Sequence, residues 1–136
     1  MTNITEEIRK LIAKSEQALI VAKDLMANGH SADAASKIYY SMFYATQALL
    51  RSEGIDVVKH SAVESAVGYH FVKKGRLEAK YHKMLIDARK IREIADYDIE
   101  QEIVKPVASL KIEQGKDFLS AIRKILGFSN RPRNSE

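Results

Sequence analysis

The 136-residue chain has no cysteine, no tryptophan and only two prolines. The lack of cysteine excludes disulfide bonds, thiolate metal sites and a cysteine nucleophile. The longest segment without a charged residue, Ile38 to Leu50, has 13 residues, which is too short to span a bilayer. Glu6, Glu7 and Arg9 would interrupt the apolar core of a signal peptide. These absences predict a soluble, cytoplasmic protein that folds without covalent cross-links.

What the chain does contain is typical of one globular domain. Apolar residues make up 46% of the sequence and charged residues 29%, which argues against a disordered chain. A domain of this length buries roughly 68% of the surface of its unfolded chain, which is enough for a hydrophobic core. We expect a single domain over residues 1–127, followed by a polar, disordered tail over residues 128–136.

Apolar side chains recur at intervals of three and four residues along most of the chain, which is the period of an α-helix. No segment shows the alternation of apolar and polar residues that a strand requires. The expected helices cover residues 5–28, 31–53, 61–75, 77–95 and 106–126. The last helix either begins near Pro106 or extends N-terminally from Ile99 with a kink. The predicted fold class is therefore all-α, an antiparallel bundle of four or five helices.

Local signals agree with this helical period. Asn3 with Glu6 matches a capping box, in which two side chains bind the free amides of a first helical turn. Ser61 with Glu64 matches the same pattern at the start of the third helix. Gly115 is expected to weaken the last helix by about 1 kcal/mol relative to alanine.

The second expected helix holds four of the ten aromatic residues within six positions. A spacing of four residues places Tyr39 over Phe43 on one helix face. Tyr40 lies over Tyr44 in the same way on the adjacent face. One pair can therefore face the core. The other pair either completes a wide buried face or lines a cleft or a dimer surface, and both interpretations stay open.

Basic residues concentrate between residues 73 and 92, where eight of them stand against two acidic residues. This segment carries a net charge of +6, whereas the whole chain carries +4. The cluster is either a solvated helix surface or a patch that contacts phosphates. As a phosphate-contacting patch it would comprise Lys73, Lys74, Arg76, Lys80, Lys83, Arg89 and Lys90.

The four histidines, His30, His60, His70 and His82, show none of the spacings typical of a metal site. Serine-nucleophile elbows and glycine-rich phosphate loops are absent as well. We therefore expect no metal, no cofactor and none of the standard hydrolase or kinase chemistries.

Three sequence blocks resemble the HEPN family (higher eukaryotes and prokaryotes nucleotide-binding domain). The first block covers residues 34–45 and contains the aromatic residues. The second combines residues 59–61 with Gly68 and residues 71–73, and the third covers residues 89–98. The combination of the aromatic block with the third block carries the resemblance, because each is a weak signal alone.

The resemblance spans residues 5–127 and points to the small stand-alone branch of the family. It implies an antiparallel helical bundle that forms homodimers and pairs with a minimal nucleotidyltransferase, often as a toxin–antitoxin system. Active members are metal-independent ribonucleases. Their signature is an arginine and a following histidine with four to six residues between them, and the two copies of this motif meet in one cleft of the dimer.

This chain departs from that motif. Arg92 matches the arginine, but no histidine follows it anywhere in the chain. The positions in question hold Tyr97, Asp98 and Ile99. A histidine exchanges a proton near neutral pH, whereas a tyrosine, with a reference pKa of about 10, is a poor base at pH 7. Efficient ribonuclease activity by the family route is therefore not expected.

Two interpretations of Arg92 stay open. In the first, Arg92 pairs with Asp96 and fixes the helix end, with Tyr97 packed beneath the last helix. In the second, Arg92 is a fork for a phosphate, and Tyr97 stacks on the ligand or hydrogen-bonds to it. The candidate ligand-binding residues are then Arg92, Asp96, Tyr97, Lys59, His60, Tyr40 and Tyr44.

Three hypotheses about function follow. The first is a HEPN-like homodimeric module that binds nucleotide or RNA and a minimal nucleotidyltransferase partner in a toxin–antitoxin-like context. The second is a metal-independent ribonuclease with a degenerate site, in which Arg92 and Tyr97 are catalytic and His60 or His82 assists. The third is a purely structural bundle that binds a partner protein. Binding is favoured over catalysis because the motif histidine is missing.

Overall fold

The computed structural model describes residues 4–128. Within this range the chain forms α-helices and one short π-helix, with no strand. The elements are α1 (Glu6–Ala27), α2 (Ser31–Arg51), α3 (His60–Val67), the π-helix η1 (Gly68–Val72), α4 (Ala79–Tyr97) and α5 (Lys105–Leu126). None of the helices in the described range is both long enough and apolar enough to cross a membrane. The predicted all-α bundle is confirmed.

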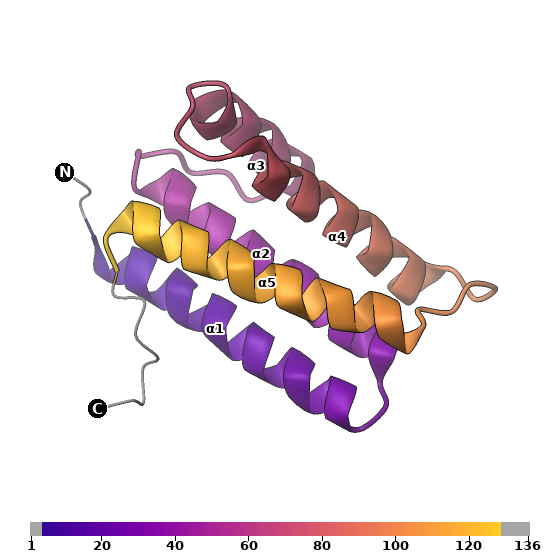
Figure 1. Cartoon of the computed structure of the whole chain (residues 1–136). Helices are drawn as coiled ribbons and strands as arrows, with labels where there is room; N and C mark the ends of the chain where they lie inside the picture. Colours follow the sequence, from indigo (N-terminus) through magenta and orange to yellow (C-terminus); the bar gives the residue numbers. More distant parts are fainter. Residues whose placement is uncertain (1–3, 129–136) are drawn as a thin grey trace, which may run out of the picture.

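α2 is the central helix of this bundle. It contacts α1, α3, α4 and α5, and Figure 1 shows it enclosed between them. Ile38, Tyr39, Leu49 and Leu50 are each 0% exposed. This position explains why residues 38–50 carry no charge, because a charged side chain on most faces of α2 would be removed from water without a partner.

The helix boundaries of α1, α2, α4 and α5 lie within two residues of the predicted ones. The N-cap of α1 is Thr5, whose hydroxyl accepts a hydrogen bond from the Ile8 amide at 3.2 Å. The predicted cap, Asn3, lies outside the described residues.

The start of α3 differs from the prediction. α3 begins at His60, so Ser61 lies inside the helix, and no side chain caps the free amides of its first turn. The predicted capping box of Ser61 and Glu64 is therefore wrong. The Glu64 carboxylate instead accepts a hydrogen bond from Arg89 Nε of α4 at 2.5 Å, because an ion pair between helices is available to it.

The third predicted helix continues past α3 as η1 and packs closely on α4. A Cβ atom added to Gly68 would lie 2.9 Å from the His82 Cε1 atom, so a larger residue would displace the His82 ring. His82 Nε2 lies 2.9 Å from the carbonyl oxygen of Glu64. His82 therefore joins α4 to the α3–η1 segment, and this ring nitrogen is engaged with the main chain.

Residues 98–104 form a loop, so the alternative in which α5 extends from Ile99 is not formed. The Asp98 carboxylate accepts a hydrogen bond from the Glu100 amide at 2.9 Å, which gives that amide a partner outside a helix. Pro106 lies in the first turn of α5, where an amide hydrogen is not needed.

The C-terminal end of the bundle extends one residue further than predicted. The Phe128 amide donates to the Arg123 carbonyl at 2.8 Å. The Arg9 and Arg123 Cζ atoms lie 5.8 and 5.3 Å from the Phe128 ring centroid. Phe128, assigned from the sequence to the tail, thus belongs to the bundle, and residues 129–136 lie outside the described range.

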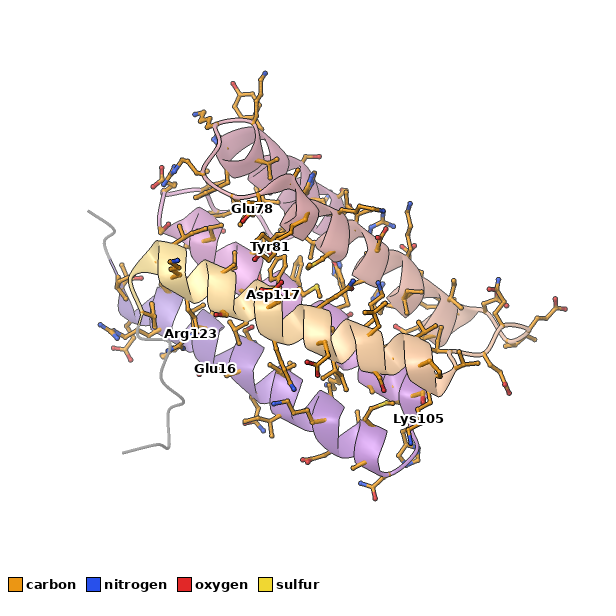
Figure 2. The ribbon with its side chains drawn as sticks, viewed as in Figure 1. Glu16, Glu78, Tyr81, Lys105, Asp117 and Arg123 are labelled. Carbon is orange, nitrogen blue, oxygen red and sulfur yellow. The ribbon has the colours of Figure 1, made fainter. Side chains whose placement is uncertain are left out.

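Two side-chain pairs labelled in Figure 2 hold α5 against its neighbours. Arg123 Nη1 lies 2.5 Å from an oxygen of Glu16 on α1, and both side chains are largely buried. The Tyr81 hydroxyl of α4 donates to Asp117 at 3.3 Å. Burial and the Asp117 carboxylate raise the pKa of Tyr81, so the phenol keeps its proton.

Candidate functional site

Three helices bring Arg92 and a histidine onto the same two tyrosine rings. Tyr39 and Tyr40 lie on α2, His60 is the first residue of α3, and Arg92 lies on α4. The Arg92 Cζ atom lies 5.5 and 5.6 Å from the ring centroids of Tyr39 and Tyr40. The His60 ring centroid lies 5.3 and 6.1 Å from the same centroids. These four residues and Tyr97, whose ring centroid lies 5.8 Å from Arg92 Cζ, are referred to below as the Arg92 cluster.

The Arg92 guanidinium is held on one side and open on the other. Nη1 donates to the Tyr40 hydroxyl at 2.9 Å and lies 3.8 Å from an Asp96 carboxylate oxygen. Nε is buried and has no hydrogen-bond partner within residues 4–128. Nη2 has no partner in this range either, but it is not buried and therefore faces solvent. The side chain is only 13% exposed, so a cation mostly removed from water keeps unsatisfied donors.

The surroundings keep Arg92 charged. Burial opposes the charge, but the hydrogen bond to the Tyr40 hydroxyl and the nearby Asp96 carboxylate outweigh it and raise the pKa of Arg92. The described residues include no group of three His, Asp or Glu side chains placed to hold a metal ion. The guanidinium has a donor, Nη2, that suits a carboxylate or a phosphate.

Tyr97 lies at the end of α4 and is 73% exposed. Together with Ile94 and Ile99, among others, it lines a surface pocket of about 540 Å³. The interpretation in which Tyr97 packs beneath the last helix is therefore wrong, whereas the predicted pairing of Arg92 with Asp96 is present. An exposed ring beside a cation is free to stack on a ligand or on a partner surface.

His60 is fixed by two aromatic residues of α2. Its Nδ1 lies 2.5 Å from the Tyr39 hydroxyl, and its ring stacks on Phe43 with the centroids 4.5 Å apart. Nε2 has no hydrogen-bond partner in the described part of the chain and is not buried, so it faces solvent. Burial and the charge of Arg92 lower the pKa of His60, which keeps the ring neutral at pH 7. Burial and Glu64 raise the pKa of Tyr39, so its hydroxyl stays protonated.

A network of ion pairs holds α3 and α4 together beside His60. Arg89 Nε binds Glu64 at 2.5 Å, and Arg89 Nη1 binds Glu93 at 3.0 Å. Glu64 lies one helical turn after His60, and Arg89 lies about one turn before Arg92. The network therefore fixes the distance between the segment that carries the histidine and the helix that carries the arginine.

Comparison with known proteins shows the family of this chain. A family model described as HEPN domain matches residues 8–131. The chain belongs to the HEPN family. Two proteins of Methanocaldococcus jannaschii, each named "Putative toxin", are 36% and 32% identical to it over 120 and 124 residues, covering 88% and 91% of this chain and 82% and 92% of theirs. A UPF0332 protein of Pyrococcus horikoshii is 37% identical over 108 residues, which cover 79% of this chain and 76% of that protein.

Two predicted ligand-binding residues of this HEPN protein lie at the margin of the Arg92 cluster. The Tyr44 ring centroid is 6.2 Å from the Tyr40 ring centroid. The Lys14 ammonium of α1 lies 4.9 Å from the Tyr44 ring centroid. Lys59 directly precedes α3 and is exposed beside His60 in the sequence. Tyr44 thus belongs to the contact between α1 and α2, whereas Lys59 is available to a ligand that reaches His60.

Three residues of the predicted basic patch form ion pairs in the HEPN bundle. Arg76 pairs with Glu53 at 2.9 Å, Lys83 pairs with Asp87 at 3.2 Å, and Arg89 pairs with the two glutamates described above. Three of these carboxylates lie outside residues 73–92, so the count along the sequence overstates the local charge. The patch lysines without a carboxylate partner in the described range are Lys73, Lys74, Lys80 and Lys90.

Some features of the HEPN site carry no signal in the sequence. The spacing of Tyr39 from the other apolar residues of its helix predicts a core residue. Its hydroxyl nevertheless contacts His60, which is 21 residues away in the sequence. The contact between Tyr40 and Arg92 joins residues 52 apart. No local sequence pattern predicts which of the four histidines packs against the tyrosines of α2.

Proposed function

We propose that this HEPN protein is the toxin-like member of a two-protein system, with a minimal nucleotidyltransferase as its partner, and that its Arg92 cluster binds a phosphate of RNA or of a nucleotide. The observation that carries the proposal is the burial of the Arg92 side chain and the lack of hydrogen-bond acceptors for its Nε and Nη2 atoms among the described residues. Its side chain is 13% exposed, and within the described residues its Nε is buried without a partner while its Nη2 faces solvent. A bound phosphate would supply an acceptor to Nη2, the donor that a ligand can reach from solvent. The names of two relatives support the toxin-like context.

The surroundings of Arg92 favour a nucleotide over a simple anion. Tyr97 offers an exposed ring beside the guanidinium, and bases of single-stranded nucleic acids stack on such rings. Lys90 lines the pocket next to Tyr97 and lacks a carboxylate partner in residues 4–128, so it can contact a neighbouring phosphate. The cation and the ring match a phosphate and a base, and Lys90 is a second cation in the pocket that Tyr97 lines.

Replacing Arg92 by alanine is expected to weaken the binding of a short single-stranded RNA by about 10- to 100-fold. The reason is the loss of charge-assisted hydrogen bonds, each worth about 1.5–3 kcal/mol. Arg92→Lys is expected to recover only part of the affinity, because lysine keeps the charge but not the planar fork. Fluorescence anisotropy titrations at two salt concentrations measure both effects.

Lys116→Ala is the matched control for this experiment. Lys116 lies exposed on α5, where it pairs with Glu113 at 3.0 Å, and its removal changes the net charge by the same unit. It is expected to alter the affinity by no more than about twofold, since exposed charges are screened by salt. An equal loss in both variants, or no binding of any RNA or nucleotide by the natural sequence, contradicts the proposal and leaves the partner-binding bundle as the better hypothesis.

We also propose that the protein forms a homodimer through the surface beside Tyr97. Ile99 and Val104 are 100% and 52% exposed, which is unusual for large apolar side chains and typical of an interface. Light scattering is expected to give a mass near twice 15.3 kDa. Ile99→Asp should shift the mass toward that of one chain, whereas Ile20→Asp, at a 52% exposed position on α1, should not. A single-chain mass for the natural sequence contradicts the dimer.

Cleavage of RNA is a second candidate function, favoured by one observation. His60 lies on the same two tyrosine rings as Arg92 and presents a solvent-facing Nε2. A histidine beside the phosphate-binding arginine would supply the proton-transfer group that the sequence motif lacks.

A further inference from the structure

We propose that the Arg92 cluster is one end of a longer binding surface, which crosses α2 to α1 and holds several nucleotides of a single-stranded nucleic acid. The proposal rests on the proposed binding of a phosphate at Arg92, and it adds the length and the strandedness of the ligand. The added part of the surface is referred to below as the α2 strip. It consists of Lys10 and Lys14 of α1 and of Tyr40, Tyr44 and Arg51 of α2.

The first observation is that no helix covers one face of α2. α5 covers the opposite face, because a Cβ atom on Gly115 of α5 would lie 3.3 Å from Ile38 of α2, and Figure 1 shows α5 in front of α2. At about 100° per residue, Tyr40 and Tyr44 lie roughly 200° and 240° around α2 from Ile38. Within residues 4–128, α1 packs on neither α3 nor α4, so these helices do not close over the two tyrosines. Both rings are accordingly partly exposed.

The second observation is that each of these tyrosines carries a cation from a different neighbouring helix. The Arg92 Cζ atom of α4 lies 5.6 Å from the Tyr40 ring centroid. The Lys14 ammonium of α1 lies 4.9 Å from the Tyr44 ring centroid, and the two ring centroids are 6.2 Å apart. The two cations thus lie over neighbouring rings, one helical turn apart on α2. Repeated cations match the repeated phosphates of a polynucleotide, whereas a single phosphate engages only one of them.

The α2 strip ends in a surface pocket of about 470 Å³ between α1 and the end of α2. Arg51 in this pocket is already paired with Glu7 and, at 2.9 Å, with Asp56. Lys10 and Lys14 also line the pocket, are exposed and have no carboxylate partner in the described part of the chain. These two lysines are therefore available to the phosphates of a strand that continues past the tyrosines.

The walls of the α2 strip favour a single strand over a duplex. The loop of residues 52–59 lies against α2 on one side, where the Gln47 amide donates to the Val57 carbonyl at 3.3 Å. α1 bounds the other side, so Tyr40 and Tyr44 are only partly accessible. Bases that are free of a partner strand can pack on such rings, whereas the bases of a duplex stay stacked inside it. The rings also favour a nucleic acid over an acidic peptide, which has the charges but no bases.

The test measures binding to the purified full chain of a nucleoside 5′-monophosphate and of single-stranded RNA and DNA of one eight-nucleotide sequence. The octanucleotides are expected to bind at least about 10-fold more tightly than the mononucleotide, because they also engage the lysines of the α2 strip. Lys14→Gln and Lys10→Gln are each expected to weaken octanucleotide binding by about 3- to 10-fold. Each should also reduce the slope of log affinity against log salt by about 0.7, which corresponds to one phosphate contact in a single strand. The mononucleotide affinity should change by less than about twofold, since Arg92 is intact.

Lys23→Gln is the matched control for these variants. Lys23 is an exposed residue of α1 as well, and it lies nine residues after Lys14, which places it about 180° around the helix. It removes the same charge from the same helix on the opposite face. Its effect on the affinity for either ligand is expected to stay within about twofold.

The outcomes separate this proposal from the one on which it rests. Equal affinities for the mononucleotide and the octanucleotides overturn the α2 strip and leave phosphate binding at Arg92 standing. An equal loss of octanucleotide affinity in Lys14→Gln and Lys23→Gln has the same consequence. Absence of binding of any nucleotide or nucleic acid overturns both proposals. A duplex of the same sequence, or polyglutamate, that competes as well as the single strand also overturns the α2 strip. A preference for RNA or for DNA supports it and identifies the natural ligand.

Discussion

Replacing Phe118 by alanine is expected to lower the free energy of unfolding by about 3–5 kcal/mol and the melting temperature by about 10–20 °C. Phe118 is 1% exposed, and its ring packs edge-to-face on Tyr81 with the centroids 6.1 Å apart. It thereby joins α5 to α4, the helix that carries Arg92. The loss combines the transfer free energy of the ring with a cavity that rigid helices cannot close.

Leu110→Ala is the matched control on the same helix. Leu110 is 55% exposed, so its truncation leaves no cavity and should change the free energy of unfolding by no more than about 0.5 kcal/mol. Urea denaturation followed by circular dichroism measures both variants. A loss below about 1 kcal/mol for Phe118→Ala would mean that α5 does not pack on α4 as described.

Replacing Ser15 by leucine is expected to lower the free energy of unfolding by about 3 kcal/mol or more. Ser15 of α1 is 0% exposed and donates to the Ser41 carbonyl of α2 at 2.6 Å. The Ser41 hydroxyl donates to the Ser15 carbonyl at 2.8 Å, so the two helices touch through small polar residues. A leucine at this contact must separate the helices and also removes a buried hydrogen bond.

Two comparisons make the Ser15 prediction specific. Ser15→Ala should cost only about 1 kcal/mol, because it removes the hydroxyl without adding volume. Ser109→Leu, at an exposed position on α5, should be nearly neutral. If Ser15→Leu and Ser15→Ala have the same melting temperature, the close approach of α1 and α2 is refuted.

The helices of this protein were predictable because their signals are local. Apolar spacing, glycines after helix ends and Pro106 depend only on neighbours within a turn or two, so most boundaries fell within two residues. The failures occurred where a distant group intervened. Glu64 does not cap α3 because Arg89 of α4 binds it.

Gly115 illustrates the limit of local reasoning about packing. Helix propensity counts it as a cost of about 1 kcal/mol in α5. In the bundle it is buried, and a Cβ atom there would lie 3.3 Å from Ile38 Cγ2 of α2. The glycine thus allows α5 to approach α2, an advantage that only the packed helices reveal.

Some features of the candidate site were predictable from the sequence, and others were not. Arg92 and its pairing with Asp96 were predictable because both lie on one helix at a spacing of four residues. The exposure of Tyr97 and the contact between Tyr39 and His60 were not predictable, because both depend on how α2, α3 and α5 pack in the bundle.

The absence of cysteine and the scarcity of proline left hydrophobic packing as the means of stabilising this chain, and the sequence alone determined that the packing would be helical. It also determined that an arginine without a following histidine would stand near the end of the fourth helix. Only the tertiary structure decided that His60 lies beside Arg92. Helical periodicity specifies which face of each helix is buried, but the pairing of residues 21 and 52 positions apart depends on how the buried faces fit together.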